Sequence, residues 1–231
     1  MTDLHTHILP DVDDGSKNIT ESVKYLHMLE RLGIKNVVLT PHFYPDNEIS
    51  ERMLERRDAA FTLLKEKDDT GIGLYLGCEC YMHEYLFHAE DLRPFCIGGG
   101  KYLLVELSYA SEDASKMLDM IHKLTAKYEV IPILAHIERY PYIMKSEKML
   151  NDFIDAGCLC QINADALLSP FKRARLLRYL ENGCIHFLGT DTHRNVISEK
   201  RFNRVRAVVK KHTGKELDEV FWGIEDIVNV K

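Results

Sequence analysis

Short apolar segments alternate with longer amphipathic segments over most of this 231-residue chain. The apolar segments have the length and β-branched content of single strands, and they cover residues 2–7, 35–42, 72–79, 102–108, 130–137, 158–163 and 186–191. The intervening segments have helical spacing, and several end in glycine, as helices commonly do; they cover residues 21–33, 49–67, 111–128, 146–157 and 169–183. A strand followed by a helix, repeated along the chain, predicts an α/β fold with parallel strands and crossover helices.

Polar residues at the strand ends distinguish an open sheet from a closed barrel. Nearly every predicted strand ends in a histidine or an acidic residue. An open parallel sheet gathers its site at one switch point, whereas a barrel brings the carboxyl ends of all its strands to one rim. We therefore expect a TIM-like barrel of seven or eight strands. The length of the chain suits a single domain over residues 1–231, with the last segment, 201–231, forming two or three helices that close the barrel.

Charge and hydropathy exclude several classes of protein. The net charge of −6 gives no general attraction to nucleic acid. No apolar run approaches the roughly 20 residues of a membrane-spanning helix, and residues 1–3 lack the basic stretch of a signal peptide. We expect a cytoplasmic protein without nucleic-acid binding or membrane insertion.

Six cysteines suit a compartment in which thiols stay reduced. Cys78 and Cys80, and likewise Cys158 and Cys160, have C-x-C spacing inside apolar runs. We expect them to pack within strands, with a thiolate metal site as the weaker alternative. No cysteine begins a C-x5-R loop, which argues against a cysteine-dependent phosphatase.

The candidate ligands come from almost every predicted strand. Each alone has an ordinary structural explanation, such as a helix cap or a core imidazole. Together on one rim they would repel or remain unsatisfied unless cations lay between them, and imidazole and carboxylate donors suit Mn, Fe or Zn. Nine candidates imply two or three ions: His5, His7, Asp14, His42, Glu79, Glu106, His136, Asp191 and His193. Asp3, Asp11 and Asp13 are expected to serve the turn or to support the ligands.

The same residues occur in an ordered set of motifs. D-L-H-T-H (3–7), D-D-G-S (13–16), T-P-H (40–42), A-H-I-E-R-Y (135–140) and G-T-D-T-H (189–193), with Glu79 and Glu106 between them, resemble the polymerase and histidinol phosphatase (PHP) superfamily. More narrowly, the chain resembles bacterial tyrosine-protein phosphatases encoded with capsule and exopolysaccharide genes. The resemblance covers residues 3 to about 194 and implies a distorted (β/α)7 barrel with a trinuclear metal centre.

The resemblance also implies how the ligands divide among three ions, with manganese expected and iron or zinc as alternatives. By matching position, the sets are His5, His7, Glu79 and Asp191; Glu79, Glu106 and His136; and Asp14, His42 and His193.

The implied reaction is hydrolysis of a phosphomonoester by metal-activated hydroxide. Arg139 and Arg194 stand close to ligand motifs and are expected to clamp the phosphate, with surface salt bridges as the alternative role. The segment after T-P-H departs from the family pattern. Its Phe43 and Tyr44 either accept an aromatic leaving group or pack the loop.

The implied substrate is a phosphotyrosine protein, namely the tyrosine-rich tail of a membrane-associated kinase of polysaccharide synthesis. Two alternatives remain open. The same metal set could hydrolyse histidinol phosphate or another small phosphoester, or the barrel could be a regulatory or scaffold subunit without catalysis. A nuclease is disfavoured by the acidic balance of the chain.

Overall fold

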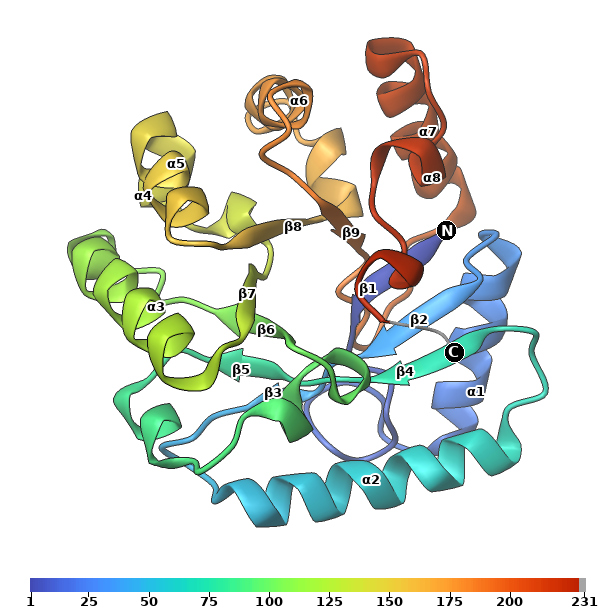
Figure 1. Ribbon diagram of the computed structural model, residues 1–231. Helices are drawn as coiled ribbons and strands as arrows, with labels where there is room; N and C mark the ends of the chain where they lie inside the picture. The colour runs from blue at the N-terminus through green and yellow to red at the C-terminus, as the bar shows by residue number, and fades with distance from the viewer. Residues whose placement is uncertain (229–231) are drawn as a thin grey trace.

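The computed structural model describes residues 1–228 and contains a curled parallel sheet with helices around its outside (Figure 1). The strands pair in the orders β1-β2-β4 and β3-β5-β6-β7-β8-β9. Their bounds are β1 (Thr2–Thr6), β2 (Asn36–Leu39), β3 (His42–Phe43), β4 (Gly73–Leu76), β5 (Glu79–Tyr81), β6 (Tyr102–Glu106), β7 (Ile131–Leu134), β8 (Leu159–Asn163) and β9 (Phe187–Gly189).

Two of the seven predicted strands are interrupted. The prediction of continuous strands over 35–42 and 72–79 is wrong, because the first divides into β2 and β3 and the second into β4 and β5. Pro41 lies at the first break and has no N–H to donate to a neighbouring strand. Residues 77–78 form the second break directly beside it.

Backbone hydrogen bonds nevertheless continue across both breaks. Gly77 N–H donates to Leu39 O at 2.9 Å, and Glu79 N–H donates to Pro41 O at 3.0 Å. Consequently His42 and Glu79 begin β3 and β5 instead of ending a strand, and they pair side by side in the register of that sheet.

The first and last strands are also connected through their backbones. Asp191 N–H donates to His5 O at 2.8 Å, and His7 N–H donates to Thr192 O at 2.8 Å. A further parallel bridge joins Thr6 to Thr192. These bonds hold the carboxyl end of β1 beside the segment that follows β9.

The helices follow the predicted segments with shifted ends. Their bounds are α1 (Ile19–Arg31), α2 (Ser50–Lys67), α3 (Ala114–Tyr128), α4 (Pro141–Lys145), α5 (Glu147–Asp155), α6 (Arg173–Glu181), α7 (Glu199–Thr213) and α8 (Leu217–Val220). Short 3-10 turns complete the elements: η1 (Glu84–His88), η2 (Arg93–Phe95), η3 (Ile97–Gly99), η4 (Ser111–Asp113), η5 (Ile137–Arg139), η6 (Ala164–Leu168) and η7 (Ile224–Asp226). None of the helices among residues 1–228 is long and apolar enough to cross a membrane.

Two predicted helix starts are wrong for local reasons. The segment 169–183 becomes helical only at Arg173, because Pro170 favours an extended conformation at Ser169, whose ψ is 124°. The segment 111–128 begins with the 3-10 turn η4, so α3 starts at Ala114. The short helix α4 is not among the predicted helices. The predicted closing helices correspond to α7, α8 and η7, and the end of that segment lies outside the described residues.

The strands separate two apolar clusters. One fills the interior of the curled sheet and includes the buried side chains of Leu4, Val38, Leu104, Ile133 and Phe187. Ile224 and Ile227 from the tail cover it, and the Trp222 ring packs edge-on to the Phe187 ring at 5.6 Å. The larger cluster lies between sheet and helices and includes the four cysteines of the two C-x-C motifs. They are buried as expected, but only Cys80 and Cys160 lie within strands, because Cys78 falls in the break after β4 and Cys158 precedes β8.

Candidate metal centre

Four side-chain donors converge at the end of β1. The Nε2 atoms of His5 and His7 face each other at 2.9 Å, although only one proton can lie between two imidazole nitrogens. Glu79 Oε2 lies 3.3 and 3.4 Å from these nitrogens, and Asp191 Oδ1 lies 3.6 and 3.5 Å from them. Two imidazole nitrogens and two carboxylate oxygens thus surround one point. This is the number and type of protein ligands that divalent metal ions use.

A second group shares the Glu79 carboxylate. His136 Nε2 lies 2.9 Å from Glu79 Oε1 and 3.6 Å from Glu106 Oε1. The Tyr109 hydroxyl donates a hydrogen bond to Glu106 Oε1. Glu79 therefore stands between the first group and this one, as a bridging carboxylate does.

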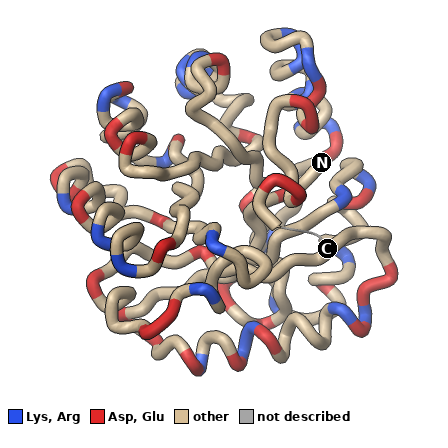
Figure 2. The backbone as a smooth tube through the Cα atoms, in the orientation of Figure 1, with Lys and Arg blue, Asp and Glu red and all other residues tan. Residues whose placement is uncertain are grey.

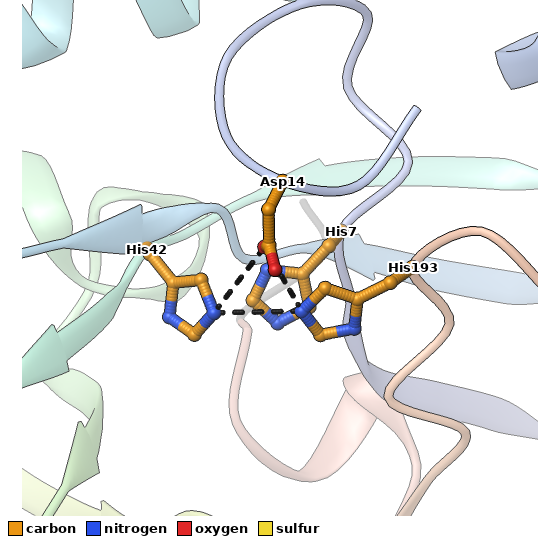
Figure 3. Close-up of side chains that lie close together, drawn as sticks. All are labelled: His7, Asp14, His42 and His193. Atoms are coloured by element: carbon orange, nitrogen blue, oxygen red, sulfur yellow. Dashed lines mark hydrogen bonds and ion pairs between the residues drawn. The ribbon is translucent and has the colours of Figure 1, made fainter. Parts of the chain in front are cut away.

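A third group gathers His7, Asp14, His42 and His193 (Figure 3). The Asp14 carboxylate lies between His42 and His193, with Oδ1 at 3.8 Å from His42 Nε2 and 3.3 Å from His193 Nε2. The two Nε2 atoms are 3.4 Å apart, and the His193 ring stacks on the His7 ring at 3.9 Å. All nine predicted ligands belong to groups of donors that could hold a metal ion.

Several buried polar atoms in these groups lack a hydrogen-bond partner. They are Asp191 Oδ1, His136 Nδ1, Glu79 Oε2 and His42 Nδ1; the last two lie 2.9 Å apart as an ion pair but without hydrogen-bond geometry. Buried polar atoms are nearly always satisfied, and leaving one without a partner costs on the order of 1–3 kcal/mol. Cations in the cluster would satisfy the carboxylate oxygens, so the residues present fit a multinuclear metal centre.

The electrostatics of the cluster lead to the same conclusion. Burial alone would lower the pKa of His7, but hydrogen bonds to Asp13 and Glu79 raise it to about 10. Burial would raise the pKa of Asp191, but the charges of His5, His7 and Arg139 lower it to about 2. Protonated histidines thus compensate the carboxylates when no cation does. A metal ion would replace those protons.

The backbone adopts a left-handed conformation at two of the predicted ligands. His136 has φ 32° and Asp191 has φ 53°, values that few residues with side chains adopt. Residues held in such conformations concentrate at functional sites. Gly189 completes the arrangement, because a Cβ there would lie 2.7 Å from the Cβ of His5.

Supporting contacts come from polar residues that the sequence did not single out. Gln161 Oε1 accepts from His136 N–H at 2.6 Å, and the Asn163 side-chain amide donates to Asp191 Oδ2 at 2.9 Å. Both are buried on β8, in the run CLCQIN. Two amide side chains in an otherwise apolar strand were the sequence signal that could have identified them as supporting residues. Asp13, assigned to a turn or supporting role, bonds His7 Nδ1 at 2.7 Å.

The two predicted arginines lie at different edges of the cluster. Arg139, in η5, forms an ion pair with Asp191 Oδ2. Arg194 Nε donates to the backbone oxygen of Asp14 at 3.1 Å.

Phe43 and Tyr44 have separate roles. Phe43 is 1% exposed and stacks on Phe95 at 4.6 Å, so it packs the loop. The Tyr44 ring is 37% exposed and stacks on the His42 ring at 5.2 Å.

Comparison with known proteins places this geometry in context. Residues 1–223 match the family described as capsular polysaccharide synthesis, CpsB/CapC. The tyrosine-protein phosphatase CpsB of Streptococcus pneumoniae is 29% identical over 96% of this chain and 95% of its own. The putative tyrosine-protein phosphatase CapC of Staphylococcus aureus is 28% identical over 84% of this chain and 77% of its own.

A solved structure is similar as well. It comes from work on YwqE of Bacillus subtilis and CpsB of Streptococcus pneumoniae, described as unique metal-dependent tyrosine phosphatases. It superposes with a TM-score of 0.75 and 26% identity over 94% of this chain and 89% of that one.

Proposed function

Because the chain belongs to the capsular polysaccharide synthesis family CpsB/CapC, we propose that it is a metal-dependent protein-tyrosine phosphatase that does not use a cysteine nucleophile. The observation that carries the proposal is the convergence of the side chains of His5, His7, Glu79 and Asp191 on one point. All six cysteines are buried and free, whereas a nucleophilic cysteine must be accessible to substrate.

The proposed ligand sets are those that the resemblance implies: His5, His7, Glu79 and Asp191; Glu79, Glu106 and His136; and Asp14, His42 and His193. The same nine residues form four overlapping groups of close donors in the structure: His7, Asp14, His42 and His193; His5, Glu79 and His136; His5, His7 and Asp191; and His42, Glu79 and Glu106. Manganese is the proposed metal, with iron and zinc as alternatives, because the donors are imidazole and carboxylate without thiolate. When bound, clustered divalent ions neutralise phosphoryl charge and lower the pKa of water.

The protein side chains then bind and orient the phosphate. Arg139 reaches the cluster through Asp191, so its guanidinium can donate paired hydrogen bonds to phosphoryl oxygens. We assign the same role to Arg194, which lies beside Asp14.

Aromatic side chains frame the cluster and favour an aryl phosphate. Tyr44 stacks on His42, and the half-exposed Tyr109 stacks on the His136 ring at 6.1 Å. The phenol released from phosphotyrosine has a pKa of about 10, so it leaves with less protonation than an alkoxide. Aromatic rings at the rim can pack against that phenyl group.

The same proposal includes the domain organisation, the cellular location and the protein substrate. We assign residues 1–231 to one domain with a closed, distorted (β/α)7 barrel, supported by the hydrogen bonds between the ends of β1 and β9. We place the protein in the cytoplasm, with the tyrosine-rich tail of a membrane-associated kinase as substrate. The family description, which refers to capsular polysaccharide synthesis, supports this partner.

A hydrolysis panel with Mn²⁺ tests the proposal. The substrates are a phosphotyrosine peptide, a phosphoserine peptide, histidinol phosphate and single-stranded DNA. We expect the phosphotyrosine peptide to be hydrolysed fastest, with activity lost on chelation and restored by Mn²⁺. Preference for histidinol phosphate would overturn the substrate, and absence of all hydrolysis would favour the regulatory or scaffold barrel.

A further inference from the structure

A basic groove adjoins the metal centre. It consists of two connected hollows of about 620 and 420 Å³, which share Glu138, Arg139 and Lys172 in their lining. One hollow extends along α4 and α6, and the other extends between η6 and α7. Together they are large enough for several residues of an extended peptide.

The charge of this groove is opposite to that of the whole chain. Its lining includes Lys172, Arg175 and Arg204, which have no acidic partner within 4.0 Å among the residues that the structure describes. The chain as a whole carries −6. The α6 segment accordingly shows a concentration of basic positions in Figure 2.

The basic residues of the lining outnumber the acidic ones, which are Glu138 and Asp165. Glu138 is 4% exposed, and its carboxylate interacts with the charges of Arg139 and Lys172. Asp165 is paired with Arg201 at 3.6 Å. Lys172, Arg175 and Arg204 have no acidic partner within 4.0 Å among the described residues and are therefore available to a ligand.

Two residues connect the groove to the site. Arg139 and Asn163 both line it, and both contact the Asp191 carboxylate. A polypeptide advances about 3.3 Å per residue when extended. A peptide with its phosphotyrosine at the metal centre would therefore place residues only a few positions away in the groove.

We propose that this groove, lined by Arg139, Lys172, Arg175 and Arg204, binds acidic side chains that flank the phosphotyrosine in the protein substrate. The inference rests on the proposed phosphatase function and adds a preference for substrate sequence. Phe171, 94% exposed at the groove rim, offers an apolar surface to the same peptide. Complementary charge of this kind gives specificity and faster association more than catalytic power.

The experiment compares two phosphotyrosine peptides of equal length, one with Glu residues flanking the phosphotyrosine and one with Gln in their place. The Mn²⁺-loaded protein should show a kcat/KM about tenfold higher for the Glu peptide at low salt, as several exposed ion pairs would produce. The double variant Lys172→Gln/Arg175→Gln should lose that preference. It should keep the wild-type rate on p-nitrophenyl phosphate, which has no flanking residues.

A matched control removes the same charge elsewhere. Lys65→Gln/Lys67→Gln alters two exposed lysines of α2, on the side of the sheet away from α6 (Figure 1). This variant should retain the preference for the Glu peptide. Equal rates for the two peptides with the wild-type protein, or a preference that survives Lys172→Gln/Arg175→Gln, would overturn the inference.

A binding measurement separates this inference from the function on which it rests. Fluorescence anisotropy with unphosphorylated Glu and Gln peptides reports on the groove even if neither phosphopeptide is hydrolysed. Tighter binding of the Glu peptide, lost in Lys172→Gln/Arg175→Gln, supports the groove independently of phosphatase activity. Binding of single-stranded DNA in preference to the Glu peptide would overturn the assignment to an acidic peptide.

Discussion

The two ends of the same parallel strands have opposite chemistry. On β6, Leu104 is fully buried in the apolar interior, whereas Glu106, two residues later, belongs to the donor cluster. On β7, Ile133 is buried among the same apolar side chains, and His136 follows the strand with φ 32°. Apolar side chains thus fill one end of these strands, and donors stand at the other end, either on the strand itself, as Glu106 does, or just beyond it, as His136 does.

The difference teaches that stability and function are separated along strands such as β6 and β7. Apolar burial at one end supplies a favourable contribution of roughly 25 cal/mol per Å². The other end collects buried carboxylates and imidazoles that need cations or protons to be tolerated. A rigid apolar end is what allows the donor end to keep its geometry. Substitutions at the two ends should therefore have effects of different kinds.

The largest expected effect is at the polar end. Glu79→Gln removes the negative charge at the carboxylate shared by two donor groups. We expect phosphatase activity to fall by about 10³-fold or more, equivalent to about 4 kcal/mol of transition-state stabilisation. Elemental analysis should show the loss of at least one metal ion, with the circular dichroism spectrum unchanged.

The matched control is Glu66→Gln, at an exposed position of α2. It should leave metal content and rate unaltered. Full metal occupancy and full activity in Glu79→Gln would refute the bridging assignment.

A substitution at the apolar end should have the converse effect. Leu104→Ala removes a fully buried side chain from the interior cluster and should lower the free energy of unfolding by about 3 kcal/mol. Metal content and kcat/KM of the folded protein should stay close to wild type. Denaturant titration and metal analysis measure the two properties separately.

Leu63→Ala provides the comparison for this change. Leu63 is 40% exposed on α2, so its truncation should cost about 0.5 kcal/mol or less. If Leu104→Ala abolished metal binding while leaving stability intact, the two ends could not be regarded as separable.

Gln161 lies at the boundary between the ends and should have a smaller effect. Its Oε1 accepts from His136 N–H, and its side-chain amide donates to Asn163 at 3.0 Å. Gln161→Leu leaves that backbone N–H without its acceptor, and such supporting contacts typically contribute about 10- to 100-fold in metal affinity. Mn²⁺ titration measures the change. Gln161→Glu keeps an acceptor and should retain most of the affinity, and equal weakening by both variants would count against the positioning role.

The order of strands and helices could be predicted from the sequence, because the spacing of apolar residues and the residue types differ between strands and helices. Short apolar runs predicted the strands around Leu4, Leu104 and Ile133 without any tertiary information. The nine donors also stand out, because charged or imidazole groups at the ends of apolar strands are uncommon unless they have partners. The structure brings all nine together.

Other features depend on tertiary contacts and could not be predicted in this way. Pro41 was a local signal for the first break, because a proline cannot donate a hydrogen bond within a sheet. The second break, at residues 77–78, lies beside it on the neighbouring strand, and the periodicity of a single segment does not reveal such coupling. The left-handed conformation of His136 and Asp191 has no local glycine signal. Gln161 was overlooked because an uncharged amide in an apolar strand resembles a minor exception to the pattern.

The smallest expected effect concerns the cysteines, which lie with the apolar packing and not with the donors. All six are buried, and burial raises the pKa of the Cys78 thiol to about 11 and that of Cys96 to about 12. Little thiolate therefore exists at neutral pH, and access to it is poor. Treatment of the folded protein with iodoacetamide should leave phosphatase activity within about 10% of the untreated rate. Mass spectrometry should find all six thiols modified only after denaturation. Loss of activity in proportion to labelling of the folded protein would show that a cysteine takes part in catalysis.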